Sequence, residues 1–217
     1  MKTYRLAALC MAAFLIFPAG LQAADSKPPE AVTAAAAQGL KPWLEKIPAS
    51  DMPRFGLDPA APLDSAVLGA PFLVHTISPA ALRQYKAGTA VEALITPTKL
   101  WYFPVLIAGE PKLILVVDYM DDQWQAVSMG YPALAREWAN VTQQWPESKG
   151  YHPVLIAVFQ AKRHLFTVPE KGASNLTPLA PAGQAGETKS SAPYSTLGEA
   201  EAVIGDLIPI VENNILN

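Results

Sequence analysis

Cysteine is nearly absent from this chain of 217 residues, since the only one is Cys10, inside an apolar N-terminal segment. Exported proteins are free to use disulfides, and cysteine catalysis and thiolate metal sites both need a thiol. Without its N-terminal segment the chain has no thiol. A chain of this length buries enough surface to fold without disulfides or metal. We therefore exclude disulfide exchange, thiol catalysis and thiolate metal sites.

The sequence also lacks runs of lysine and arginine. It has 16 basic and 19 acidic residues, and its formal net charge at pH 7 is −3. Nucleic-acid binding needs clustered basic side chains to neutralise phosphates, and a basic amphipathic surface is what holds a helix on an anionic membrane. We therefore expect no nucleic acid as a partner and no attachment to a membrane surface.

Motifs that carry catalysis or hold a cofactor are missing as well. The sequence has no Gly-x-Ser-x-Gly elbow, no Ser-x-x-Lys pair and no glycine-rich loop that would cradle a phosphate. Its three histidines, His75, His152 and His164, do not have the close helical spacing of zinc ligands. We therefore predict no catalytic residues, no metal site and no cofactor.

The N-terminus has the layout of a secretory signal peptide. Lys2 and Arg5 precede an apolar run without charge, residues 6–17, and small residues around Ala23 offer a cleavage site. The run is shorter than the ~20 residues that cross a bilayer. We predict that residues 1–23 are a bacterial signal peptide and that the protein is exported, to the periplasm or outside the cell. We expect no stable membrane insertion after cleavage.

Composition divides the remaining chain into four parts. They are an Ala- and Pro-rich arm with irregular wrapping, an α+β core domain, a low-complexity tract and an amphipathic helix. In order, these parts cover residues 24–71, 72–169, 170–194 and 195–217. The tract is rich in Gly, Ala, Ser, Thr and Pro and has few large apolar side chains, so we expect a flexible loop there.

The arm is expected to begin with a short helix. The helix opens after Pro29 and ends at Gln38, because Gly39 suits the C-cap position. Pro42 would kink or break any continuation. We expect Trp43, together with Leu44, to anchor the arm on the core domain.

The core domain shows the patterns of an antiparallel sheet. β-Branched and aromatic runs predict strands at residues 72–77, 100–107, 112–119, 123–129, 154–160 and 164–168. The turns between consecutive strands are short, which implies antiparallel neighbours. We therefore predict an α+β fold whose antiparallel sheet has about five to six strands in a β-β-β-α-β-β core. Its helices are expected to lie mostly on one face of the sheet.

Helices are expected between these strands and at the C-terminus. The clearest covers residues 132–145, where large apolar side chains recur at i, i+4, i+7 and i+11. Shorter helices are expected at 78–82 and 89–95, and a strand is the alternative for the second of these segments. The terminal segment has apolar residues along one side, so it must dock either on this domain or on a partner.

The tetrapeptide Tyr119-Met120-Asp121-Asp122 separates two of the expected strands. Its letters resemble the catalytic tetrapeptide of reverse transcriptases, in which two aspartates hold Mg²⁺ at a hairpin turn. This chain is acidic, however, and has neither a second carboxylate motif nor a basic channel. We therefore interpret the two aspartates as a polar tight turn. A weak Ca²⁺ site that includes Asp118 is the alternative.

Aromatic side chains are the candidates for a binding site. In the strand expected at 100–107, Trp101 and Phe103 share one face and Tyr102 lies on the other, while Trp124 begins a neighbouring strand. Trp and Tyr are favoured contacts for a peptide, a glycan or an apolar ligand. We predict these four residues to bind a ligand or partner. The alternative is that a helix and the arm cover both faces and bury them.

Two segments match the N-glycosylation pattern: Asn140-Val141-Thr142 and Asn175-Leu176-Thr177. The first falls inside an expected helix, and the signal peptide is of bacterial type, so we count neither as modified. Asn175 lies in the expected flexible tract and should therefore be accessible to solvent.

Together these observations favour an exported, non-enzymatic binding or accessory protein of the bacterial cell envelope, with an envelope protein or a small ligand as its partner. One alternative is a secreted hydrolase or metal-dependent enzyme, which would need a cleft that gathers a histidine with Asp118, Asp121 or Asp122. A second is a protease inhibitor or folding helper. It would need an exposed strand edge or a protruding loop, for which residues 172–194 are the natural candidate.

Overall fold

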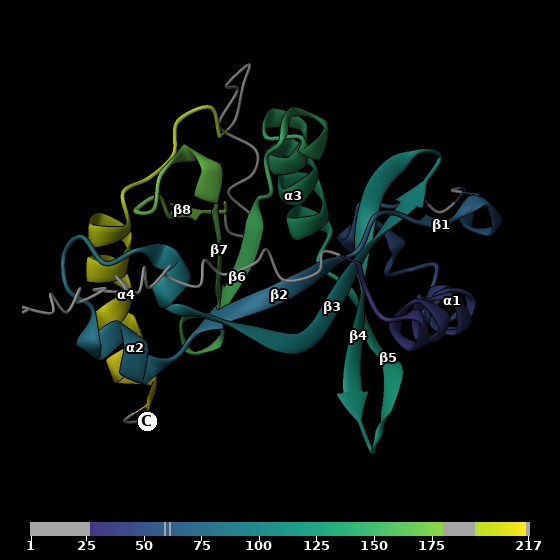
Figure 1. Ribbon diagram of the computed structural model, residues 1–217. Coiled ribbons are helices and arrows are strands. Elements are labelled where there is room, and N and C mark those ends of the chain that lie inside the picture. Colours follow the sequence, from purple (N-terminus) through teal and green to yellow (C-terminus); the bar gives the residue numbers. More distant parts are fainter. Residues whose placement is uncertain (1–26, 59, 61, 180–193, 216–217) are drawn as a thin grey trace, which may run out of the picture.

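The computed structural model describes residues 27–58, 60, 62–179 and 194–215 (Figure 1). The expected signal peptide, with Cys10, lies outside the described residues, as does most of the expected flexible tract. The α-helices of the described part are α1 (Glu30–Glu45), α2 (Pro79–Gln84), α3 (Pro132–Gln144) and α4 (Ala200–Ile215). Its strands are β1 (Val67–Leu68), β2 (Phe72–Ile77), β3 (Ile95–Ile107), β4 (Glu110–Met120), β5 (Gln123–Gly130), β6 (Val154–Val158), β7 (Arg163–Thr167) and β8 (Thr177–Pro178).

The described strands form one sheet of eight, so the fold is α+β as expected, although the sheet is larger than predicted. Its order is β5-β4-β3-β2-β6-β7-β8, and β1 pairs with β3. The expectation of a purely antiparallel sheet is wrong, because β2 pairs in parallel with β6, with His75 opposite Ile156. Short turns in the sequence reveal hairpins between neighbouring strands, whereas this pair joins strands that are far apart in the chain.

Helix α3 packs on one face of the sheet. The expected stripe of Leu134, Trp138, Val141 and Trp145 is confirmed, and all four side chains are buried in the same cluster. The ring of Trp138 lies 4.7 Å from the ring of Phe72 in β2, measured between centroids. These bulky contacts make α3 the main cover of this face.

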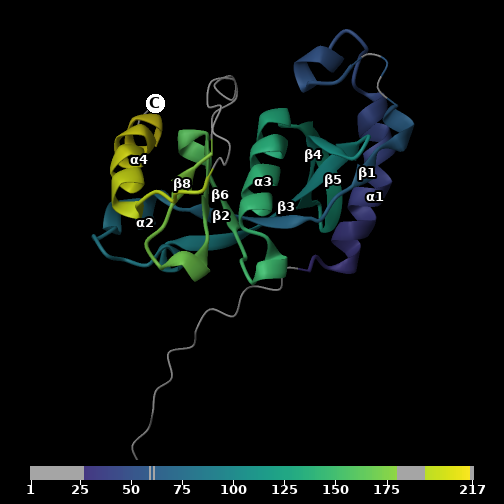
Figure 2. The ribbon, with the colours of Figure 1, turned by 90° about the horizontal axis from the view of Figure 1, so that it is seen from above.

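Helix α1 packs on the opposite face, so helices cover both faces of the sheet. In β4, the side chains of Ile114 and Val116 join the cluster under α3, while Leu115 between them joins the cluster under α1. This alternation follows from the pleat of a strand, whose successive side chains point to opposite faces. The sheet therefore has a core on each side. Figure 2 shows α1 and α4 at opposite ends of the sheet with α3 between them.

The C-terminal helix docks on its own domain. Ile204, Leu207 and Val211 of α4 are buried with Ile156 of β6 and Leu82 of α2 in a third cluster. The sequence left open whether this amphipathic face would meet the domain or a partner. The structure places it against α2 and the β6–β7 end of the sheet (Figure 1).

The arm differs from its prediction because α1 continues to Glu45 and contains both Gly39 and Pro42. Gly39 is not a C-cap but the point at which α1 comes closest to β5. An ideal Cβ built on Gly39 would lie 2.2 Å from the Cβ of Ala126. The indole of Trp43 donates a hydrogen bond to the Ala126 carbonyl at 3.0 Å, so the expected anchor is in place.

Two other segments also differ from expectation. The helix expected at 89–95 is one 3₁₀ turn, Val91–Ala93, and β3 already begins at Ile95. The tract expected to be flexible from residue 170 onwards contains β8, at Thr177–Pro178. None of the helices described is both long and apolar enough to span a membrane.

Candidate functional site

The four aromatic residues predicted to bind a partner have different surroundings. Trp101 and Phe103 are buried in the cluster under α1, with 5% and 2% of their surface exposed. Tyr102 is 4% exposed and lies on the opposite face, 5.8 Å from Phe72 between ring centroids. These three rings are core residues, which is the covered arrangement considered as the alternative. Trp124 is half-buried and is the member of the set that reaches the surface.

Trp124 belongs to the β4–β5 hairpin, whose tip extends away from the rest of the sheet (Figure 1). Asp121 and Asp122 form the turn, with φ of 50° and 61°. Two successive positive φ angles are typical of a type I′ turn, and Asp tolerates this backbone conformation. The interpretation of the two aspartates as a tight turn is therefore confirmed. Tyr119 and Met120 precede the turn and are 36% and 48% exposed.

A hollow of about 370 Å³ separates this hairpin from the N-terminal half of α1. Small and polar side chains of the helix line one wall, and the end of the hairpin lines the other. The lining residues are Ala31, Ala34, Ala35, Gln38, Tyr119, Asp122, Gln123 and Trp124. We call this hollow the hairpin groove. The close contact at Gly39 holds the helix against β5, and the groove lies on the N-terminal side of that contact.

Two aromatic rings form the hairpin side of the groove. The rings of Tyr119 and Trp124 meet edge to face, with centroids 5.2 Å apart and an interplanar angle of 65°. Lys99 of β3 places its Nζ 4.4 Å from the centroid of the Tyr119 ring. This cation–π contact shows that an aromatic face of the hairpin already holds a positive charge.

The polar groups of the hairpin are satisfied only in part. The Tyr119 amide donates to Asp118 at 2.7 Å, and the Gln125 side chain donates to the Met120 carbonyl at 3.1 Å. Among the ion pairs of the described residues, none includes Asp121 or Asp122. The Asp122 carboxylate is therefore free to contact a ligand in the groove.

A second, larger hollow of about 440 Å³ lies between Gly56 and the β3–β4 turn, beside Ala60. Its two charged lining residues, Glu110 and Lys112, form an ion pair with each other at 2.5 Å. No aromatic side chain lines it in the described part of the chain. The hairpin groove is the better candidate because, among the described residues, no cation lies over its Trp124 ring and no ion pair includes its Asp122 carboxylate.

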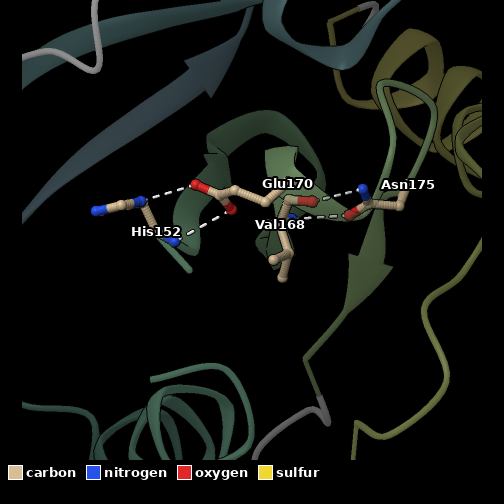
Figure 3. Close-up of polar contacts among 4 residues, drawn as sticks. All are labelled: His152, Val168, Glu170 and Asn175. Atoms are coloured by element: carbon tan, nitrogen blue, oxygen red, sulfur yellow. Dashed lines mark hydrogen bonds and ion pairs between the residues drawn. The ribbon is translucent and has the colours of Figure 1, made fainter. Parts of the chain in front are cut away.

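The histidines lie in separate environments. His152 is paired with Glu170 through Nδ1 and Oε1 at 2.8 Å, and its backbone amide donates to Oε2 of the same carboxylate at 3.2 Å (Figure 3). Partial burial alone would raise the pKa of Glu170. Hydrogen bonds from the Glu170 backbone and from the His152 side chain and backbone outweigh that burial, so the pKa is lowered from 4.5.

The other two histidines are more enclosed. The ring of His164 lies 6.4 Å from that of Tyr131, which in turn stacks on Tyr102 at 6.2 Å between centroids. Burial raises the pKa of Tyr102 to about 12, with a further rise from Tyr131, and burial lowers the pKa of His164. Both side chains are therefore uncharged at neutral pH. Burial also lowers the pKa of His75, against a smaller opposing effect of the Leu73 backbone.

The structure does not assemble a metal centre from these residues. In the described part of the chain, no three His, Cys, Asp or Glu side chains are grouped so that they could hold a metal ion. The partner that the structure records for the His152 ring is Glu170, and the one for the His164 ring is Tyr131. Neither contact involves an aspartate of the hairpin.

Asn175 is a structural residue and not an accessible glycosylation site. It is 7% exposed, and its Oδ1 accepts hydrogen bonds from the Val168 amide at 2.8 Å and from the Thr167 hydroxyl at 3.1 Å. Its Nδ2 donates to the carbonyls of Val168 and Gly172, and Figure 3 shows the bonds between Asn175 and Val168. The expectation that Asn175 is accessible is therefore wrong, because its side-chain amide is buried and hydrogen-bonded to the backbone of the loop after β7.

Comparison of the chain with models of known protein families, with curated proteins and with solved structures gives no match. The geometry of the groove therefore carries the functional argument by itself. The sequence predicted Trp124 as a binding residue and considered Asp122 only as a turn or metal-binding residue, and it gave no indication of Tyr119 or of the alanines of α1. Tyr119 lies at the exposed end of β4, where the alternation of side chains along the strand is the signal that identifies it.

Proposed function

We propose that this protein is an exported, non-enzymatic binding or accessory protein of the bacterial cell envelope, and that it recognises its partner at the hairpin groove. Export rests on the signal-peptide pattern of residues 1–23. The binding role rests mainly on one observation: Tyr119 and Trp124 line an open hollow at a hairpin tip, beside a carboxylate without an ion-pair partner.

The chemistry of this surface is that of a recognition site. Folded proteins bury most of their large aromatic side chains, as this protein does with Trp101 and Phe103. Tyr and Trp are enriched where proteins meet partners, because one ring offers both apolar contact area and a polar group. Met120, 48% exposed beside the groove, adds an adaptable apolar contact.

Site-specific photo-crosslinking in intact cells tests this proposal. A photo-reactive phenylalanine analogue is placed at Gln123, which lines the groove, and in a second variant at Phe159, which is 47% exposed on the 3₁₀ turn Phe159–Ala161 next to α4. We expect one cross-linked partner of defined mass from the Gln123 variant and none from the Phe159 variant. The same product from both positions, or none from Gln123, would contradict recognition at the groove.

A further inference from the structure

We infer that the hairpin groove takes a cationic side chain, the lysine or arginine of a basic segment in the partner protein. This inference rests on the proposed function and names the chemistry of its ligand. Three features around one hollow support it: two aromatic rings, a carboxylate without an ion-pair partner, and a wall of alanine methyl groups from α1.

The aromatic wall suits a positive charge. A ring face attracts a cation within about 6 Å of its centroid, and Trp is the strongest of the aromatic side chains in this respect. Two such contacts occur among the described residues on this side of the protein. The Nζ of Lys99 lies 4.4 Å from the centroid of the Tyr119 ring, and the Nζ of Lys46, at the C-terminal end of α1, lies 4.2 Å from the centroid of the Trp43 ring. In the described residues no such cation lies over Trp124. The groove thus has an aromatic face for one further cation.

The charge of the groove is complementary to a cation. Asp122 is its one charged lining residue, and Asp121, the other residue of the turn, lies outside the lining. No lysine or arginine of the described residues is within ion-pair distance of either carboxylate. The whole chain has a net charge of −3, and removal of residues 1–23 would make it more negative because that segment carries only basic charges. Such a field speeds the approach of a basic partner.

The opposite wall suits the aliphatic part of a long cationic side chain. Ala31, Ala34 and Ala35 offer methyl groups without charge, and Gln38 adds an amide at one end. Lysine and arginine bury their methylene stems along apolar surface while the charged head stays at a polar rim. A hollow of about 370 Å³ is within the range of ligand-binding pockets, ~300–1,000 Å³.

A peptide of alternating alanine and lysine is the probe, and the same peptide with every lysine acetylated is its matched neutral form. Affinity is measured by titration calorimetry, and the indole N–H signal of Trp124, assigned from a Trp124→Phe variant, locates the peptide by NMR. We expect the lysine peptide to shift this signal and to bind more weakly as salt is added. The acetylated peptide should bind at least about tenfold more weakly, because it has lost its charges.

Two variants of the turn distinguish a direct contact with the Asp122 carboxylate from a general effect of negative charge. Asp122→Asn should weaken binding of the lysine peptide about fivefold, whereas Asp121→Asn, which removes the same charge from the same turn, should change it less than about twofold. Asn tolerates a positive φ as Asp does, so both variants keep the hairpin. Circular dichroism and an unchanged melting temperature verify this.

Equal effects of the two variants, or equal binding of the acetylated peptide, would overturn cation recognition. If cross-linking from Gln123 still captures one partner in that case, the groove binds its partner through apolar contact and the proposed function stands. If the lysine peptide fails to bind and Gln123 also captures nothing, both proposals are wrong.

Discussion

Helices α1 and α3 cover opposite faces of the same sheet, yet they pack in different ways. Helix α3 buries large side chains, with Trp138 and Trp145 among them, and the Trp145 indole donates to the Tyr194 carbonyl at 3.1 Å. The first half of helix α1 buries Val32, Ala35 and Ala36, and its Gly39 meets β5 with no room for a Cβ, while Leu44 is buried near its C-terminal end. Helix α3 therefore packs on the sheet through large side chains, whereas the first half of α1 packs on it through smaller ones.

The difference explains why the candidate site lies beside α1. Large side chains between α3 and the sheet fill the space on that face, so its aromatic residues contact one another. Small side chains on the first half of α1 leave a hollow between the helix and the end of the hairpin, and Tyr119 and Trp124 border it. The helix that contributes less bulk to the core therefore forms the wall of the groove.

The largest expected effect comes from the α3 face. Trp138→Ala removes a ring that is 5% exposed and packed on Phe72, and we expect the free energy of unfolding to fall by about 3–5 kcal/mol. Chemical denaturation followed by circular dichroism measures this loss. The same substitution at the half-buried Trp124 should cost less. A Trp138→Ala variant as stable as the parent, or destabilised less than Trp124→Ala, would show that large buried side chains do not stabilise the α3 face more than the α1 face.

A smaller effect is expected from the close contact of α1. Gly39→Ala places a Cβ 2.2 Å from the Cβ of Ala126, so helix and strand must separate, and overpacking of this kind costs about 1–3 kcal/mol. Gly205→Ala in α4 is the matched control, because its Cβ would meet nothing within 4 Å. In that helix the substitution should stabilise the protein by about 0.4–1 kcal/mol. Thermal melting of the two variants should therefore give shifts of opposite sign.

If both alanine variants raised the melting temperature, the contact at Gly39 would not be close in solution. The comparison of the two helices would then lose its basis, and so would the position of the groove wall. If Gly39→Ala instead lowered stability and also weakened cross-linking from Gln123, the comparison of the two helices would be strengthened, since α1 and the hairpin both line the groove.

The local elements of this fold are readable from the sequence, whereas its long-range pairings are not. The helix at Pro132–Gln144 follows from its apolar stripe, and the β4–β5 hairpin follows from its two aspartates. The parallel pairing of β2 with β6 leaves no local signal, because each strand has the same apolar pattern whichever neighbour it takes. The sequence also predicted a helix end at Gly39. A glycine needed for close packing cannot be distinguished by sequence alone from a glycine needed for a C-cap.

The candidate site was predictable only in part, for a similar reason. Periodicity places Trp101 and Tyr102 on opposite faces of β3, which is correct, but it does not say whether a helix will cover each face. The two helices that cover these faces are far from β3 in the sequence. Helix α1 ends about 50 residues before β3, and α3 begins only after the β4–β5 hairpin. The groove needs α1 and the hairpin together, so its lining could not be identified before the two were placed.

The smallest expected effect concerns the pair formed by His152, just before β6, and Glu170, in the 3₁₀ turn Pro169–Lys171 after β7 (Figure 3). The pKa of Glu170 is lowered from 4.5 in the folded protein, so its carboxylate contributes stability above that pH. This contribution is lost as the pH falls through the lowered folded value. Because both side chains are partly exposed, it should be below about 1 kcal/mol.

Denaturation of the parent and a Glu170→Gln variant from pH 7 down to pH 2.5 measures this contribution. We expect the parent to be slightly more stable near neutrality and the difference to shrink as the pH falls below 4.5, because protonation then makes the two side chains alike. Glu147→Gln, at an exposed position in the preceding 3₁₀ turn (Glu147–Lys149), is the control and should follow the parent throughout. A Glu170 difference that grew on acidification would mean that the carboxylate destabilises the fold, and that burial outweighs its hydrogen bonds.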